Sequence, residues 1–281
     1  MASALLLSLA ASSAAAQAPG AAERGAYLAA AAGCGQCHTD QQGGGKPYAG
    51  GRRLETVWGV VAAPNITPDR ETGIGRWSFA DFERALRWGV APDDSHYLPA
   101  FPFIFYNGLA DPDLRDLKAF LDSLPAVAQQ NRRGEQGLLS ISWAKAAVAV
   151  VAEPHDGPWR PDPDKDAEWN RGAYLAATIG RCGDCHTPRT VLGVRNPERT
   201  LAGAAAGGPG GKKVPNITPD PKVGIGDWSL EDIQTLLESG QTPDLDFVGG
   251  AMGEIVRNTG RLTDEDRRAI AVYLKSLPPH H

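Results

Sequence analysis

The sequence predicts an all-α fold of two tandem domains joined by a partly apolar linker, and three observations lead to it. Residues 24–29 read Arg-Gly-Ala-Tyr-Leu-Ala and return unchanged at residues 171–176. Each copy ends in an amphipathic segment followed by Ser-Leu-Pro, and alternating, strand-like patterns are sparse in both copies. An internal repeat of this length indicates two copies of one structural unit.

The order of segments along the chain follows from this repeat. We expect a signal peptide at residues 1–18, an N-terminal domain at 19–125, a linker at 126–165 and a C-terminal domain at 166–281. Residues 4–11 are apolar and precede Ala-x-Ala cleavage sequences, which is typical of exported proteins. A basic segment is missing ahead of them, so a disordered Ala-rich leader is the alternative. No later run reaches the ~20 apolar residues of a membrane span, so we expect a mature chain without a transmembrane anchor.

The composition is that of a globular protein, with 42% hydrophobic and 22% charged residues. The net charge of −5 is too small to indicate a nucleic-acid partner or an anionic membrane. The chain has only four cysteines, and all of them fall within two short motifs.

Those motifs are two Cys-x-x-Cys-His sequences. They comprise Cys34, Cys37 and His38 in the first copy, and Cys182, Cys185 and His186 in the second. This is the attachment sequence of a c-type haem: both thiols add to the haem vinyl groups, and the adjacent histidine is the proximal iron ligand. Half a zinc site or a redox dithiol is the alternative, but no further Cys or His follows at zinc-ligand spacing. The sequence therefore predicts two covalently bound haem c groups.

The repeat also predicts where the helices begin. A helix through Arg-Gly-Ala-Tyr-Leu leads into each Cys-x-x-Cys-His, and a Gly- and Pro-rich loop follows. Ser78 and Ser229, each with an Asp three residues later, then predict helix starts. A last helix in each copy, at 113–125 and 263–278, is expected to pack back on the first. Thr263 followed by Asp266 predicts a capping box at the start of the second of these.

The linker contains an apolar segment at residues 138–152, with Trp143 and a single charge, Lys145. It is too short to cross a bilayer. Two readings stay open: the segment is tucked between the domains, or it is a docking surface for a partner subunit or a membrane face.

Met252 is the candidate distal ligand of the second haem. It is the only methionine besides the initiator, and it lies 66 residues after His186 on the loop expected before the last helix. A haem iron has two axial positions, and a thioether is a common second ligand. A core methionine that packs on the ring is the alternative.

The first haem cannot have the same ligand. The two copies align without gaps from Pro64 and Pro215 onward, and this alignment puts Phe101 opposite Met252. His96, five residues before Phe101, is the remaining histidine on that loop and the candidate distal ligand. An open or water-bound iron covered by Phe101 stays possible, as does ligation by Tyr97 or Lys46. With His96 as ligand, the first haem would have the lower potential, and electrons would run from the N-terminal to the C-terminal haem.

The chain resembles the multihaem cytochrome c subunits of bacterial periplasmic dehydrogenases. The resemblance covers residues 22–278 and rests on Pro-Asn-Ile-Thr-Pro-Asp, Gly-Ile-Gly-x-Trp-Ser, His-x-Leu-Pro-Ala-Phe-Pro-Phe and Trp-Asn-Arg-Gly-Ala-Tyr-Leu. It implies two class I cytochrome c domains in tandem. Relatives of this kind serve alcohol, gluconate and sorbitol dehydrogenases, as well as some molybdenum aldehyde or N-heterocycle oxidoreductases.

This sequence departs from the family pattern in three places. Many relatives have three haems and a C-terminal membrane anchor, whereas this chain has two haem motifs and no anchor. Many have Met where this chain has Phe101. A proline whose carbonyl would orient the proximal histidine follows only the second motif, as Pro188.

The function that these features predict is electron transfer in the periplasm, by a soluble or peripheral protein without substrate chemistry of its own. The expected donor is a periplasmic dehydrogenase, and the acceptor is another cytochrome, an oxidase or a quinone-linked complex. The alternative is a dihaem peroxidase, or another small-molecule redox enzyme, with an open first haem. A haem-based sensor is a third class, but no output domain is attached.

Overall fold

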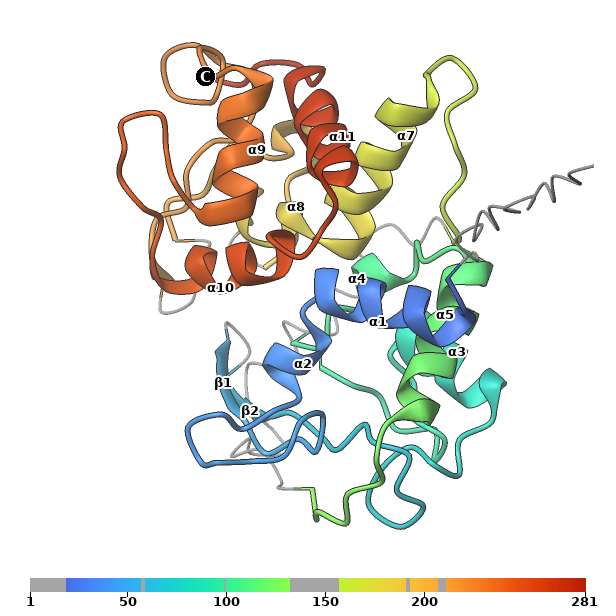
Figure 1. Ribbon diagram of the computed structural model, residues 1–281. Helices are drawn as coiled ribbons and strands as arrows, with labels where there is room; N and C mark the ends of the chain where they lie inside the picture. The colour runs from blue at the N-terminus through green and yellow to red at the C-terminus, as the bar shows by residue number, and fades with distance from the viewer. Residues whose placement is uncertain (1–18, 57–58, 99, 132–156, 191–192, 207–210) are drawn as a thin grey trace, which may run out of the picture.

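The computed structural model describes residues 19–56, 59–98, 100–131, 157–190, 193–206 and 211–281. Over these residues the chain forms two helical halves that pack against each other (Figure 1). The expected all-α fold is confirmed, because helices make up most of the regular structure. The expected signal peptide, residues 1–18, and the apolar part of the linker, residues 138–152, lie outside the described residues.

The two halves have corresponding elements. The first half contains α1 (Ala21–Ala31), α2 (Cys34–Cys37), β1 (Arg53–Thr56), β2 (Gly59–Ala62), α3 (Phe79–Trp88), α4 (Phe103–Tyr106) and α5 (Asp111–Ser123). The second half contains α7 (Ala167–Tyr174), the π-helix η1 (Leu175–Ile179), α8 (Cys182–His186), the 3-10 turn η2 (Pro197–Arg199), α9 (Leu230–Ser239), α10 (Gly250–Thr259) and α11 (Asp264–Lys275).

The β1–β2 hairpin is an addition that the sequence did not predict. Its strands are antiparallel, with Leu54 paired to Val61. Side chains of directly paired residues point to the same face of a hairpin. Both side chains line the cavity described below, so the hairpin forms one wall of that cavity.

The predicted helix starts are confirmed for α3 and α9. Ser78 and Ser229 cap these helices, and in each case the Asp three residues on returns a hydrogen bond to the cap. The capping box predicted at Thr263 is only half formed. Thr263 accepts from the Asp266 N–H, but the Asp266 carboxylate binds Arg171 and Tyr27 instead of the cap backbone.

The repeated Arg-Gly-Ala-Tyr-Leu segment is explained by helix packing. Gly25 on α1 faces α5 so closely that a Cβ would overlap the carbonyl oxygen of Asp116, and Gly172 on α7 meets the Ala269 carbonyl of α11 in the same way. The adjacent arginines anchor the crossings. Arg24 binds both carboxylate oxygens of Asp116 at 2.6 and 2.8 Å, and Arg171 binds Asp266 likewise.

The repeated tyrosine of the same segment, Tyr27 or Tyr174, joins the halves reciprocally. Tyr27 of α1 donates to Asp266 at 2.6 Å and accepts from the Thr263 N–H at the start of α11. Tyr174 of α7 donates to Asp113 at 2.7 Å and accepts from the Ala110 N–H at the start of α5. Each first helix thus binds the N-terminus of the other half's last helix, and one buried apolar cluster runs through both halves.

Candidate haem sites

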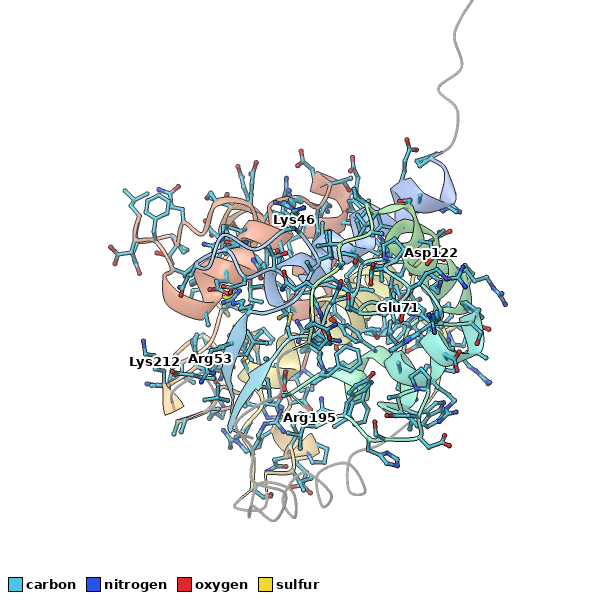
Figure 2. All side chains as sticks on the ribbon, turned by 90° about the horizontal axis from the view of Figure 1, so that it is seen from below. Lys46, Arg53, Glu71, Asp122, Arg195 and Lys212 are labelled. Carbon is cyan, nitrogen blue, oxygen red and sulfur yellow. The ribbon has the colours of Figure 1, made fainter. Side chains whose placement is uncertain are left out.

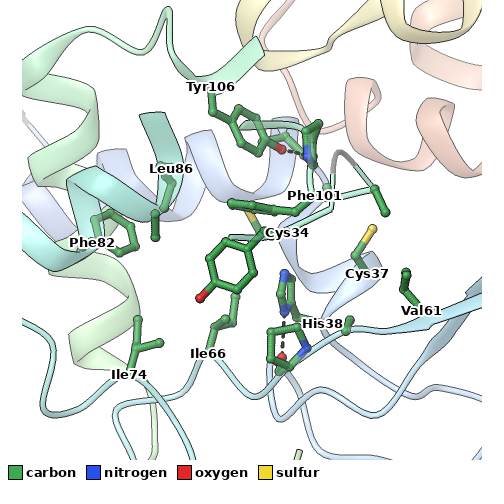
Figure 3. A pocket seen from close by; sticks show the side chains of 18 of the residues that line it. Cys34, Cys37, His38, Val61, Ile66, Ile74, Phe82, Leu86, Phe101 and Tyr106 are labelled. Carbon is green, nitrogen blue, oxygen red and sulfur yellow. Dashed lines mark hydrogen bonds between the residues drawn. The ribbon is translucent and has the colours of Figure 1, made fainter. Parts of the chain in front are cut away.

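The first haem site comprises Cys34, Cys37 and His38, which α2 and the residue after it hold together. All three line an apolar cavity of about 360 Å³ (Figure 3). The cavity walls are formed mainly by aliphatic and aromatic side chains, among them Leu54, Val61, Ile66, Ile74, Phe82 and Leu86. A hollow of this character beside two thiols and an imidazole fits a flat apolar ring that is tethered at one edge.

The imidazole of His38 is oriented by a backbone carbonyl. Its Nδ1 lies 2.7 Å from the carbonyl oxygen of Pro64. A carbonyl only accepts, so Nδ1 carries the hydrogen and Nε2 keeps its lone pair for a metal. Burial lowers the pKa of His38, although the hydrogen bond to Pro64 acts in the opposite direction. The lowered pKa favours the neutral imidazole, which is the form that binds a metal.

The second haem site, Cys182, Cys185 and His186, is oriented in the same way. His186 Nδ1 lies 2.8 Å from the carbonyl oxygen of Pro215, and burial lowers the pKa of His186. The prediction that only the second site has an orienting proline, Pro188, was wrong. The orienting carbonyls belong to the first residue of Pro-Asn-Ile-Thr-Pro-Asp in both copies, far from the histidines in sequence but adjacent in space.

The Asn of that motif holds the loop in place. Asn65 accepts from the backbone N–H and hydroxyl of Thr67 at 2.9 and 2.7 Å, and Asn216 binds Thr218 equivalently. Asn65 also donates to the Val127 carbonyl at 2.7 Å. The repeated motif is therefore a rigid loop that fixes the carbonyl in front of each histidine.

The far side of the first cavity is aromatic. The Phe101 ring lies 5.7 Å from that of Tyr97 and 5.9 Å from that of Tyr106. In Figure 3, Phe101 and Tyr106 lie on the side of the cavity opposite His38. Burial raises the pKa of Tyr97 to about 12, which disfavours a phenolate ligand. Lys46, which is labelled in Figure 2, is exposed and is not among the lining residues.

His96 lies at the rim of this cavity. It is one of the lining residues, but it is exposed. Its backbone bridges to Val90, and Phe247 bridges to Gln241 at the corresponding place in the second half. These two equivalent backbone bridges agree with the gapless alignment of the two loops, which puts Phe247 opposite His96.

Met252 does not lie on a loop, as the sequence suggested, but in the first turn of α10. Its equivalent, Phe101, precedes α4. The helix begins earlier in the second half, so the thioether is held on a helical backbone. Met252 itself is half-buried.

No sequence pattern indicates the contacts between the first haem site and α10. Gln36, inside the first Cys-x-x-Cys-His, is hydrogen-bonded to Asn258 at 3.0 Å and to the backbone of Glu254. Arg52 donates to the Gln36 carbonyl at 2.7 Å and pairs with Glu254 at 3.0 Å. The helix that carries Met252 is therefore also bound to the first haem site.

A second residue that the sequence did not single out is Arg181, immediately before Cys182. Its side chain crosses to the first half and lines the first cavity. The only sequence signal is its place next to a haem motif, where the first copy has Gly33.

The alternatives of a zinc site and a redox dithiol are disfavoured by the surroundings of the thiols. Burial raises the pKa of Cys34 to about 12 and that of Cys182 to about 11. Metal thiolates and reactive dithiols need a lowered thiol pKa. Among the described residues, no group of three or more His, Cys, Asp and Glu could hold a metal ion.

The haem-binding motifs, the carbonyl-held histidines and the enclosing helices define a c-type cytochrome. The family model for cytochrome c matches residues 22–125. The chain is 44% identical, over 92% of its length, to a diheme cytochrome c-type protein of Cereibacter sphaeroides, and it spans 86% of that relative. The chain belongs to the cytochrome c family and carries two covalently bound haem c groups.

Longer relatives are dehydrogenase subunits. The chain is 39% identical to the cytochrome c subunit of alcohol dehydrogenase (quinone) of Gluconacetobacter polyoxogenes, over 99% of this chain and 61% of the relative. It is 36% identical to the gluconate 2-dehydrogenase cytochrome c subunit of Pantoea cypripedii, over 91% of this chain and 59% of the relative. The chain thus spans about three fifths of these subunits. None of the helices described here has the length and apolarity to cross a membrane.

Proposed function

We propose that this chain is a dihaem electron carrier, which accepts electrons one at a time from a dehydrogenase and delivers them to a downstream acceptor. The similarity to cytochrome c subunits of alcohol and gluconate dehydrogenases supports the donor. The acceptor is another cytochrome, an oxidase or a quinone-linked complex. When bound, each haem supplies an iron that gains and loses one electron. Binding, orientation and burial are the work of the protein.

The observation that carries this proposal is the duplicated support of the proximal histidines. In both halves a neutral imidazole donates through Nδ1 to a proline carbonyl, at 2.7 and 2.8 Å, which leaves Nε2 free for iron. We assign the thioether bonds to Cys34 and Cys37 at the first site, and to Cys182 and Cys185 at the second. His38 and His186 are then the proximal ligands.

We further assign Met252 as the distal ligand of the second haem and His96 as that of the first. His96 lines the first cavity, whereas Phe101, at the position equivalent to Met252, has no donor atom. Because His96 is exposed at the rim, its ligation needs the loop 90–98 to move inward. The competing arrangement is an open iron behind Phe101, which would suit a peroxidase.

The ligation is tested by EPR and near-infrared spectra of the oxidised protein, wild type beside His96→Ala. Tyr97→Phe is the control on the neighbouring residue. We expect two low-spin haems in the wild type and in Tyr97→Phe, with one turning high-spin in His96→Ala. A high-spin haem already present in the wild type would refute His96 ligation. Turnover of hydrogen peroxide by that protein would then support the peroxidase function.

The donor is tested in a periplasmic extract of the source organism. Oxidised, purified protein is added, followed by ethanol, gluconate or another dehydrogenase substrate, and haem reduction is recorded optically. We expect reduction with at least one substrate and none without substrate. Reduction by none of them would argue against a dehydrogenase as donor.

We also propose that residues 1–18 are removed on export and that domains at 19–125 and 166–281 flank the linker. The mass of the protein recovered from the periplasm tests the export step. An intact N-terminus, or a protein found only in the cytoplasm, would contradict it.

A further inference from the structure

Arg181 connects the two haem sites. It immediately precedes Cys182 of the second site, yet its guanidinium group lies in the wall of the first cavity, together with Cys34 and Cys37. There Nη2 donates to the carbonyl oxygen of Ala32 at 3.3 Å, and the guanidinium carbon lies 5.5 Å from the centre of the Tyr106 ring. A side chain of the second half thus places a cation beside the haem of the first.

Among the described residues, the acid nearest to Arg181 is Asp184, at 3.9 Å. That carboxylate is bound more closely by Arg189, at 2.6 Å. Asp184 is thus shared between two arginines and compensates the charge of Arg181 only in part. The Nε of Arg181 is buried and has no hydrogen-bond partner in the described part of the chain, and the side chain is only 18% exposed.

The arginine is peculiar to the second copy. The residue before the first motif is Gly33, with φ of +73°, and Arg181 has the same left-handed backbone, with φ of +53°. Glycine adopts this conformation freely, whereas an arginine there is uncommon. The second copy keeps an arginine in a backbone position that suits glycine. Strained residues of this kind often carry a functional constraint.

We propose that Arg181 is a fixed positive charge that raises the reduction potential of the first haem. Reduction lowers the charge of the iron centre by one, so a nearby cation in a low-dielectric wall favours the reduced state. Arginine keeps its charge at any physiological pH. This inference rests on the two covalent haems and does not depend on which dehydrogenase is the donor.

Because Arg181 belongs to the second half of the chain, this role makes the reduction potential of the first haem depend on that half. Ligation by two histidines would lower that potential relative to a His/Met haem. Arg181 acts in the opposite direction, so it narrows the potential difference between the haems. A narrower difference keeps transfer between the two haems reversible.

The test is optical and EPR potentiometry of Arg181→Gln beside Arg181→Lys, with no partner protein present. The first haem is identified as the one whose potential rises in Phe101→Met. We expect Arg181→Gln to decrease the equilibrium constant for reduction of the first haem about tenfold, which is about 59 mV for a one-electron couple. Arg181→Lys keeps the charge and should retain most of the potential. Equal decreases in both variants would overturn the proposal, because packing and not charge would then be responsible.

Two further variants keep the proposal testable where Arg181→Gln fails to bind haem. Asp184→Asn removes the acid next to Arg181 and should raise the potential of the first haem. The double variant Arg268→Gln with Glu168→Gln removes an ion pair between α11 and α7, away from both haem sites, without changing the net charge. The equilibrium constant for reduction of the first haem should then change by less than about twofold. A lowered potential in Asp184→Asn, or a decrease in the double variant as large as that expected for Arg181→Gln, would refute a charge effect.

Discussion

His38 and His186 depend on carbonyl groups that belong to distant loops. Each donates its Nδ1 hydrogen to the proline that opens Pro-Asn-Ile-Thr-Pro-Asp. Hydrogen bonds of this kind fix the tautomer and ring orientation of a metal-ligating histidine. Since the donor and acceptor are equivalent in both halves, the proximal sides of the two haems are alike. The two haem sites differ in the candidate distal ligands and in Arg181.

The distal asymmetry can be removed by one substitution. Phe101→Met places a thioether at the position equivalent to Met252, inside the first cavity. We expect a His/Met haem at the first site, with a raised potential, because a thioether favours ferrous iron. Near-infrared spectra and potentiometry of the oxidised protein check this. Phe101→Leu is the control without a donor atom. An unchanged spectrum in Phe101→Met would mean that the loop holds residue 101 away from the iron.

At the scale of the elements, the first and last helices of each half cross at a glycine. Gly25 and Gly172 leave no room for a Cβ against the carbonyls of α5 and α11. The same short segment supplies the arginine and tyrosine that bind those helices. This explains three residues of the repeated segment: the glycine and the arginine are set by the helix crossing within each half, and the tyrosine by the contact with the other half.

Replacing either glycine should weaken its half of the molecule. Gly25→Ala and Gly172→Ala must push the helices apart, and overpacking of this kind costs about 1–3 kcal/mol. Chemical denaturation of the holoprotein measures the loss. Gly253→Ala, inside α10, is the control, because its Cβ would meet only the Val248 carbonyl at 3.3 Å. Alanine there should cost less than at either crossing, because its Cβ meets one atom at 3.3 Å instead of overlapping a carbonyl, and alanine favours the helix. Equal effects at all three glycines would mean that the crossings do not matter.

At the scale of the whole molecule, the two halves are joined by a reciprocal contact. Tyr27 binds the start of α11, and Tyr174 binds the start of α5. The contact holds the two haem sites side by side and keeps Arg181 against the first cavity. With the role proposed for Arg181, weakening this contact should change the potential of the first haem.

Acid should weaken the contact through Asp266. Burial alone would raise the pKa of Asp266, but hydrogen bonds from Arg171 and Tyr27 outweigh it and hold the pKa below its ordinary value. The folded pKa is thus lower than the unfolded one. The stabilisation is complete above the unfolded pKa of about 3.9 and is lost as the pH falls through the folded pKa.

Asp266→Asn tests this pH dependence. We expect it to lower the free energy of unfolding near pH 7 by about 1–2 kcal/mol, since the hydrogen bonds are charged but Arg171 is partly exposed. The difference from wild type should begin to shrink below about pH 4, where the carboxylate of the unfolded chain becomes protonated, and should disappear once the pH is below the folded pKa. Asp244→Asn, on an exposed loop, should show no such difference. A pH-independent difference for Asp266→Asn would contradict the assignment.

The sequence by itself determined the cofactors, the repeat and the helix starts. Cys-x-x-Cys-His and the Ser-x-x-Asp caps act over a few residues, so their chemistry is visible in a short window. The same holds for Phe101, whose lack of a donor atom follows from its residue type alone.

Only the tertiary structure decided what lies around these residues. The carbonyls of Pro64 and Pro215 could not be recognised in advance, because every residue has a carbonyl and only folding selects which one faces a histidine. Tyr27 and Asp266 are 239 residues apart, and nothing in either position marks the other as a partner. Arg181 has a place in the sequence next to the second haem, but the packing of the two halves turns its charge toward the first. Long-range contacts of this kind depend on the geometry of the whole core, which no local pattern encodes.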